Sequence, residues 1–310
     1  MKLSFIIPVF NEKESLERLY SEILENIENK DYEIIFIDDG SSDNSFNIME
    51  RLAKRDKRVK IIKFRKNFGK SASLQTGFEN AKGDIIFTMD ADLQDNPTEI
   101  PEFIEKIEEG YDLVTGWKKN RKDPISKTIP SKFFNFITSI SFKLKLHDYN
   151  CGFKAYKKEV INEIDIYGEM HRYIPAIVHT KGFKVTEIPV EHRPREFGRS
   201  KYGVERYLRG FLDLLTVKLL TSFTHSPLYL FGRIGSTFSI IGFLIGLYLT
   251  IMKYAFHQPL YNRPLLFLSI LLIMVGLQFF SIGLLGELIV NQSRDKNKKR
   301  IISIEKTLNF

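Results

Sequence analysis

Three aspartates lie within six positions of the segment "TMDADLQDNP" (residues 88–97), directly after an apolar run: Asp90, Asp92 and Asp95. Carboxylates at this spacing repel one another and raise one another's pKa unless a cation or hydrogen-bond donors offset their charge. Three interpretations are open: an acidic loop that caps a helix beginning at Pro97, a calcium loop of the EF type, or a divalent-metal site for a phosphorylated ligand. The EF-type loop is excluded because its glycine at position six and its glutamate at position twelve are missing.

The spacing Asp-x-Asp-x-Gln, formed by Asp90, Asp92 and Gln94, suits a Mg²⁺ or Mn²⁺ site. Mg²⁺ takes few protein ligands and completes its coordination with substrate phosphates, so an open set of oxygen ligands at a strand end is sufficient. A second acidic pair, Asp38 and Asp39, can accept hydrogen bonds from a ribose or a base edge. The Gly-Ser-Ser sequence that follows is also typical of a plain turn with a helix cap.

The elements that must position these residues alternate along residues 1–115. Apolar runs predict strands at 2–10, 32–39, 59–64 and 84–90, and helical patterns predict helices at 11–29, 42–56 and 69–83. This alternation is typical of an α/β fold with a mainly parallel, doubly wound sheet. Such sheets bind ligands beyond the carboxyl ends of their strands. The polar segments 8–12, 38–43, 65–70 and 90–95 are therefore expected on one edge of the sheet.

Two long uncharged segments follow, at residues 234–252 and 265–286. Each is long enough to cross about 30 Å of hydrocarbon as a helix. We expect a transmembrane hairpin with helices at about 229–253 and 264–290; two buried core helices are the alternative. The predicted organisation is a catalytic domain (1–226), the hairpin (227–290) and a basic cytoplasmic tail (291–310).

Basic residues are concentrated in 193–218 and in the tail, whereas the link between the spans has only Lys253 and Arg263. The positive-inside tendency then places the catalytic domain and both termini in the cytoplasm, at the cell (inner) membrane. The net charge of +8 suits an anionic membrane surface or anionic ligands. Nucleic acid is disfavoured because no nucleic-acid motif is recognised. The single cysteine, Cys151, excludes an intrachain disulfide and fits a reducing compartment.

Residues 126–147 and 204–223 mix apolar and basic side chains. This pattern predicts amphipathic helices that lie at the membrane interface or, alternatively, pack on the domain.

Five motifs occur in order: "FIIPVFNE", "IDDGSSDNS", "RKNFGKSASLQTGF", "GDIIFTMDADLQDNP" and "CGFKAYKK". Together they resemble the inverting glycosyltransferases of family 2, which have a GT-A fold. Within that family the chain is similar to the polyprenyl-phosphate glycosyltransferases, which include the dolichyl-phosphate mannose synthases. The resemblance spans residues 1–205, and the two apolar segments resemble the bacterial branch. Processive polysaccharide synthases carry a Gln-x-x-Arg-Trp motif, which is absent because the one tryptophan is Trp117 in "TGWKK".

The resemblance implies roles for individual residues. A nucleotide pocket would be formed by Pro8, Phe10, Glu12, Ile37 and Asp39. The metal and diphosphate segment would comprise Asp90, Ala91, Asp92 and Gln94, with Asp92 and Gln94 as the favoured direct ligands. The basic groups near the donor's phosphates would be Arg121, Arg195 and Lys201, and the lipid phosphate would lie near Arg121, Lys127 and Ser131. Lys127 stands where arginine is frequent, which keeps the charge but loses the two-pronged hydrogen bonding.

Asp148 and Asp92 are the residues implied for catalysis. A polyprenyl monophosphate has a second pKa of about 6 and is largely dianionic at pH 7, so it needs little proton removal. Asp148 could therefore act as a general base or as an orienting group. His171 is a secondary candidate for contact with the sugar.

The predicted function is inverting transfer of one sugar, with UDP-glucose as the favoured donor, to polyprenyl (undecaprenyl) phosphate at the cytoplasmic membrane face. The product would serve glycan or cell-envelope modification. The alternatives are a GDP-mannose-dependent polyprenyl-phosphate mannose synthase and a non-catalytic nucleotide-binding membrane adaptor. The cofactor would be Mg²⁺ or Mn²⁺. Gly242-x-x-x-Gly246 suggests a homo-oligomer formed through the transmembrane helices.

Overall fold

The computed structural model describes residues 1–27, 30–119, 125–194, 196, 216–218, 227–257, 259, 264–293 and 304–309. The chain divides into two compact units. The first contains Met1–Val217 together with Arg300–Phe310, and the second contains Lys218–Lys299. Each unit is described by itself below.

The first unit is built on a sheet with the strand order β7-β5-β6-β4-β1-β2-β3-β8. The strands are β1 Lys2–Val9, β2 Asp31–Asp38, β3 Val59–Phe64, β4 Ile85–Thr88, β5 Leu113–Lys118, β6 Lys154–Lys157, β7 Val185–Val190 and β8 Ile304–Leu308. Parallel pairs join β1 to β2 and β4, β2 to β3, and β5 to β7. β6 runs antiparallel to its neighbours β4 and β5, and β8 runs antiparallel to β3. The predicted mainly parallel sheet is confirmed.

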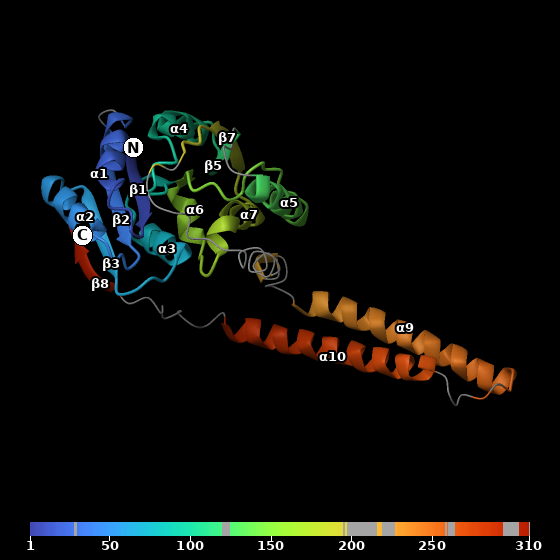
Figure 1. Cartoon of the computed structure of the whole chain (residues 1–310). Helices are drawn as coiled ribbons and strands as arrows, with labels where there is room; N and C mark the ends of the chain where they lie inside the picture. The colour runs from blue at the N-terminus through green and yellow to red at the C-terminus, as the bar shows by residue number, and fades with distance from the viewer. Residues whose placement is uncertain are drawn as a thin grey trace. The chain divides into compact units, whose positions relative to one another are not determined.

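Helices cover both faces of this sheet (Figure 1). They are α1 Leu16–Glu25, α2 Ser45–Arg55, α3 Lys70–Asn80, α4 Ile100–Glu108, α5 Ile125–Phe142, α6 Lys158–Glu163 and α7 Ile174–Thr180, with short 3₁₀ turns η1 Pro97–Glu99 and η2 Met170–Tyr173. One apolar core joins the sheet to α1, α2 and α4, and a second joins it to α3, α6 and α7. Along β1, Phe5 and Ile7 enter the first core while Ile6 enters the second, which explains why the strand is apolar throughout.

α5 covers most of the predicted amphipathic segment 126–147 and begins one residue before it. Its inner face packs Phe134 and Ile137 against the second core, and Phe142 is buried. Its outer face leaves Phe136 and Ile140 each 63% exposed. Of the other predicted amphipathic segment, 204–223, the structure describes only residues 216–218, which are helical; the remainder lies outside the described residues.

Strand β8 was not predicted from the sequence, which assigned residues 291–310 to a tail. Figure 1 shows β8, in red, beside β3 at the edge of the sheet. The amide of Asn309 donates to the carbonyls of Ala53 and Val59, each at 3.0 Å, and Leu308 packs against the first core. The chain therefore returns to its first unit after the second unit is complete.

The second unit contains two long apolar helices, α9 Pro227–Ala255 and α10 Pro264–Ser293. They are candidate membrane spans, and only 17% and 11% of their most apolar windows are buried. The large apolar side chains of these helices are mostly exposed, which disfavours the alternative of two buried core helices.

Small residues bring α9 and α10 together. A Cβ at Gly276 would lie 2.1 Å from the hydroxyl of Ser239, and a Cβ at Gly242 would lie 2.8 Å from the carbonyl of Ser269. The Ser269 hydroxyl also donates to the carbonyl of Gly242 at 2.8 Å. A Cβ at Gly246 would meet the Ser269 hydroxyl at 3.0 Å. The Gly242-x-x-x-Gly246 pattern thus serves contact within the chain, and the predicted homo-oligomer stays a prediction.

Candidate active site

The predicted polar edge of the sheet exists, and its residues contact one another across strands. Asp39 follows β2, Asp90 follows β4, and Lys154 begins the antiparallel strand β6 at the same edge. The loop 148–152 precedes β6 and lies against the segment after β4, since Gly152 is in contact with Asp90.

The turn after β2 is fixed to the end of β1. Asn11 has a left-handed backbone (φ 56°), and its side-chain oxygen accepts the N–H of Ser42 at 2.8 Å. Its own N–H donates to the Ser41 hydroxyl at 3.0 Å, and the N–H of Glu12 donates to the Ser45 hydroxyl at 2.9 Å. Asp43 accepts the N–H of Ser45 at 2.9 Å. The turn interpretation of this segment is confirmed, but the N-cap of α2 is Asn44, whose side chain makes no cap hydrogen bond.

Asp39 connects this turn to the beginning of α3. Its carboxylate accepts the N–H groups of Phe68 at 2.6 Å and Gly69 at 3.0 Å. Burial raises the pKa of Asp39 to about 6, against the lowering effect of these two donors. Asp39 thus orients the backbone that leads to Lys70, in addition to any contact with a nucleotide.

The other residues proposed for the nucleotide pocket differ in their exposure. Pro8, Phe10 and Glu12 are half-buried at the edge of the sheet. Ile37 is fully buried in the second core and Ala91 is buried in the first. Contact of a ligand with Ile37 or Ala91 would therefore involve the backbone.

The candidate metal segment after β4, residues 90–94, forms a tight loop. Leu93 takes a left-handed backbone (φ 61°) and buries its side chain, and the N–H of Gln94 donates to Asp92 at 3.2 Å. Asp95 accepts the N–H of Asp90 at 3.2 Å. The helix-cap interpretation also holds, but the cap is Asn96, whose side chain accepts the N–H of Thr98 at 3.2 Å.

The residues present fit a divalent ion bound with few protein ligands. Asp92 supplies a carboxylate, and the amide nitrogen of Gln94 approaches His192 and the carbonyl of Arg193, each at 3.4 Å, which turns the Gln94 carbonyl oxygen away from them. Within the described part of the chain, no group of three or more His, Cys, Asp or Glu residues could hold a metal. An open site of this kind relies on substrate phosphates for the remaining ligands.

Three lysines that the sequence analysis did not single out surround these aspartates. Lys70 forms an ion pair with Asp90. Lys118 lies 3.5 Å from the carboxylate of Asp95, and Lys154 donates to the carbonyl of Cys151. Burial alone would raise the pKa of Asp90, but Lys70, Lys118 and Lys154 hold it below its usual value. The cations offset the repulsion that the acidic spacing implies.

Asp148 is 1% exposed and accepts the N–H of Asn150 at 3.1 Å. Two bonds hold the loop that follows it: Thr88 donates to the carbonyl of Gly152 at 2.9 Å, and Lys154 donates to the carbonyl of Cys151. Burial raises the pKa of the Cys151 thiol to about 12, so this cysteine is not a nucleophile near neutral pH.

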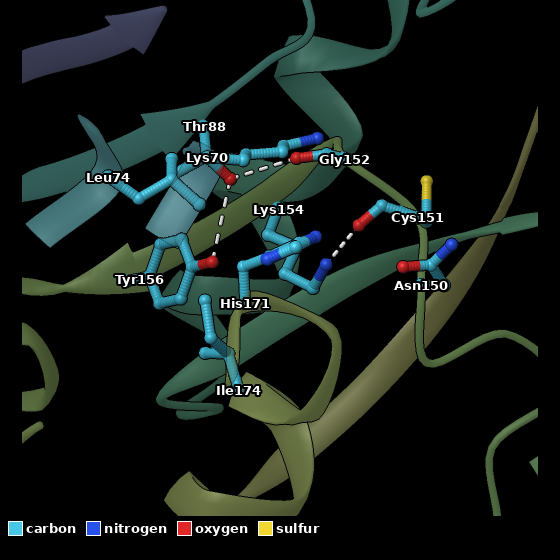
Figure 2. A pocket seen from close by; sticks show the side chains of 10 residues that line it. All are labelled: Lys70, Leu74, Thr88, Asn150, Cys151, Gly152, Lys154, Tyr156, His171 and Ile174. Atoms are coloured by element: carbon cyan, nitrogen blue, oxygen red, sulfur yellow. Dashed lines mark hydrogen bonds between the residues drawn. The ribbon is translucent and has the colours of Figure 1, made fainter. Parts of the chain in front are cut away.

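Figure 2 shows the small cavity beneath this loop, with Lys70, Thr88, Lys154 and His171 among its lining residues. His171 Nδ1 lies 3.0 Å from the hydroxyl of Ser71, which also accepts the backbone N–H of His171 at 3.1 Å. Burial, followed by the positive charge of Lys70, lowers the pKa of His171 well below 6.5. His171 is therefore neutral at pH 7, with one ring nitrogen engaged by Ser71.

Hydrogen bonds also join the candidate metal segment and Asn96 to residues 191–193, which are distant in the sequence. The backbone N–H of Arg193 donates to the backbone carbonyl of Gln94 at 3.1 Å. The Arg193 guanidinium donates to the side-chain oxygen of Asn96 at 2.7 Å and to the carboxylate of Glu22 at 2.6 Å. Asn96 donates to Glu191 at 2.9 Å. Residues 191–193 therefore brace the loop that carries Gln94.

Several predicted residues cannot be placed. Arg121, Arg195 and Lys201 lie outside the described residues. Lys127 and Ser131 lie on α5, whose backbone is described while their side chains are not.

Comparisons with known proteins agree with this architecture. The family model described as Glycosyl transferase family 2 matches residues 4–165. The dodecaprenyl-phosphate galacturonate synthase of Rhizobium johnstonii is 35% identical over 296 residues, which cover 93% of this chain and 88% of that protein. The undecaprenyl-phosphate 4-deoxy-4-formamido-L-arabinose transferase of Klebsiella pneumoniae is 36% identical over 292 residues, with 93% and 88% covered.

Among solved structures, glucosyl-3-phosphoglycerate synthase from Mycobacterium tuberculosis, in complex with Mn²⁺, UDP and glucosyl-3-phosphoglycerate, superposes with a TM-score of 0.55. It is 16% identical, and the match covers 70% of this chain and 79% of that one. This likeness shows the fold.

Proposed function

Because the chain belongs to glycosyltransferase family 2 and is a transferase with the GT-A fold, we propose that it moves one sugar from a nucleotide sugar to a polyprenyl phosphate. The observation that carries this proposal is the single edge of the sheet where Asp39, the segment Asp90–Gln94 and the loop that begins at Asp148 meet. The relatives named for polyprenyl-phosphate substrates match nearly the whole chain and support the acceptor class.

The donor is proposed only as a nucleotide sugar. The names of the two relatives specify galacturonate and 4-deoxy-4-formamido-L-arabinose, and neither specifies glucose. UDP-glucose therefore stays a prediction, with GDP-mannose as the alternative, and sugars of the two named kinds belong in any donor test.

In the proposed reaction an oxygen of the acceptor phosphate attacks the anomeric carbon and forms the new C–O bond. The bond from that carbon to the diphosphate breaks, the nucleoside diphosphate leaves, and the configuration inverts. Asp90, Asp92 and Gln94 would hold Mg²⁺ or Mn²⁺, with Asp92 and Gln94 as the favoured direct ligands. The ion would supply positive charge for the diphosphate. Asp148 is buried and held by the N–H of Asn150, so we assign it an orienting role, with general-base action as the alternative.

Membrane attachment through α9 and α10 is supported by their length and exposed apolar surface. β1 and β8 belong to one sheet, and the hairpin lies between them in the sequence. This arrangement supports both termini on the same side of the membrane that the hairpin would cross, and we propose the cytoplasmic side from the distribution of basic residues. The exposed Phe136 and Ile140 on α5 suit contact with the bilayer interface.

The test is incubation of the purified full-length protein with undecaprenyl phosphate, Mg²⁺ or Mn²⁺, and a panel of labelled nucleotide sugars. Label is expected to enter the lipid phase from one donor. Asp92→Asn should lower the rate by about 100-fold or more, the usual scale for losing a preorganised charge contact. Asp31→Asn, at the exposed start of β2, is the matched control and should transfer as the parent does.

Transfer from none of the donors would overturn the proposal and favour the non-catalytic adaptor. Parent-like transfer by Asp92→Asn would remove Asp92 from the metal site.

A further inference from the structure

Lys70 connects the segment at the end of β2 with the segment at the end of β4 in the candidate site. It is the first residue of α3 and follows Gly69, whose φ of +91° turns the chain into the helix. The carboxylate of Asp39 fixes the N–H groups of Phe68 and Gly69 at the end of β2. From this anchored start the Lys70 side chain reaches Asp90 at the end of β4.

Asp90 is held from its other side by Gly152. A Cβ at residue 152 would lie 2.6 Å from Oδ2 of Asp90, so the carboxylate rests directly on the glycine backbone. Lys70 approaches the other oxygen, Oδ1. The charge of Asp90 is therefore neutralised by a side chain of the protein itself.

Among the three lysines near these aspartates, Lys70 is the one placed to change partners. Its side chain is 24% exposed and that of Asp90 is 32% exposed. The side chain of Lys118 is 13% exposed beside the buried Asp95, and Lys154 is 3% exposed with its amine on the carbonyl of Cys151. Figure 2 shows Lys70 extending along the edge of the cavity toward Gly152.

We propose that Lys70 is an exchangeable counter-ion: it neutralises Asp90 while no divalent ion is bound, and transfers its contact to the donor's diphosphate when ion and donor bind. An ammonium and a divalent cation repel each other at one carboxylate, so Lys70 opposes binding of the ion alone. The diphosphate brings negative charge that the same ammonium can bind. The part of this inference in which Lys70 contacts the donor's diphosphate rests on the proposed function.

The proposal predicts that one substitution at Lys70 strengthens the binding of Mn²⁺ alone and weakens the binding of UDP. Lys70→Met keeps the length of the side chain and removes its charge. Without nucleotide it should bind Mn²⁺ about two- to fivefold more tightly, the scale of a partly exposed ion pair. With Mn²⁺ present it should bind UDP about tenfold more weakly or worse, because a charge-assisted bond is lost.

The measurement is Mn²⁺ binding to the full-length protein in nanodiscs, followed by the electron paramagnetic resonance signal of free Mn²⁺, first alone and then with UDP. Lys70→Arg, which keeps the charge, is the matched control and should behave as the parent does. In an Asp90→Asn background, competition for the carboxylate is already lost, so the change in Mn²⁺ affinity caused by Lys70→Met should differ from that in the parent, which reveals the coupling between the two residues.

Equal or weaker Mn²⁺ binding by Lys70→Met without nucleotide, including no binding by either protein, would overturn the counter-ion role. Tighter Mn²⁺ binding with unchanged UDP binding would overturn the transfer to the diphosphate. The Mn²⁺ titration uses neither a nucleotide sugar nor polyprenyl phosphate, so its result is separate from success or failure of the transfer assay.

Discussion

Gly152 lies directly against the carboxylate of Asp90, and a Cβ at residue 152 would come within 2.6 Å of Oδ2. Gly152 cannot easily move away, because its carbonyl accepts the Thr88 hydroxyl at 2.9 Å. We expect Gly152→Ala to displace Asp90 and to lower sugar transfer by about 100-fold, the scale of a misplacement near 1 Å in an active site. The assay is label transfer into undecaprenyl phosphate, together with Mn²⁺ binding.

Gly232→Ala is the matched control, because a Cβ there would meet nothing nearer than 3.8 Å. It should retain the activity of the parent. Full activity in Gly152→Ala would show that the position of Asp90 does not matter for transfer.

Glu99 gives a pH dependence whose sign follows from its surroundings. Burial raises the pKa of Glu99 to about 7 from an ordinary 4.5, although the N–H of Glu191 partly opposes this. The folded protein therefore holds the Glu99 proton more tightly than the unfolded chain. The stability contributed by Glu99 is present below pH 4.5 and is lost as pH rises through about 7.

Glu99→Gln keeps an oxygen to accept the N–H of Glu191 and has no charge to bury. We expect it to be more stable than the parent by about 1 kcal/mol at pH 8 after allowance for solvent screening, with little difference at pH 4. Urea unfolding followed by the fluorescence of Trp117 measures the difference. A difference that does not change with pH would contradict the raised pKa.

The sequence predicted the elements that depend on local pattern. The strand predicted at 59–64 is the observed Val59–Phe64, and the strand predicted at 32–39 is the observed Asp31–Asp38. An apolar run between turn residues is sufficient for such elements, and the parallel order then brings the strand ends to one edge. The edge that carries Asp39 and Asp90 was predictable for this reason.

Contacts that join distant segments were not predictable from local pattern. Lys70 and Asp90 are 20 residues apart, and Arg193 and Asn96 are 97 apart, so no local spacing signals either pair. The pattern Gly242-x-x-x-Gly246 indicates close contact between helices but does not identify the partner helix. β8 is a five-residue strand, too short for periodicity to distinguish it.

The edge position of β8 makes its removal informative. Deletion of residues 304–310 would expose the ladder groups of β3 and remove the two bonds from Asn309. Exposed edges are open to exchange and to pairing with other chains. We expect amide hydrogen exchange in Val59–Phe64 to rise by about tenfold or more, which corresponds to roughly 1.4 kcal/mol of local stability.

Exchange in β4 should change much less, because β1 and β2 separate it from β3. Asn309→Ala removes the two side-chain bonds alone and should give a smaller rise in β3. Unchanged exchange in β3 after the deletion would show that β8 does not pair there in solution.

The contact between Gly276 and Ser239 predicts how the apolar hairpin responds to added volume. A Cβ at Gly276 would lie 2.1 Å from the Ser239 hydroxyl and 2.6 Å from the carbonyl of Gly235, so Gly276→Val must push α10 away from α9. Spin labels at Tyr248→Cys and Leu265→Cys, in a Cys151→Ser background, report the separation by electron–electron double resonance in nanodiscs. We expect a longer and broader distance distribution. Met274→Val, on an exposed face of α10, should leave it unchanged; an unchanged distribution in Gly276→Val would contradict the close packing of the two helices.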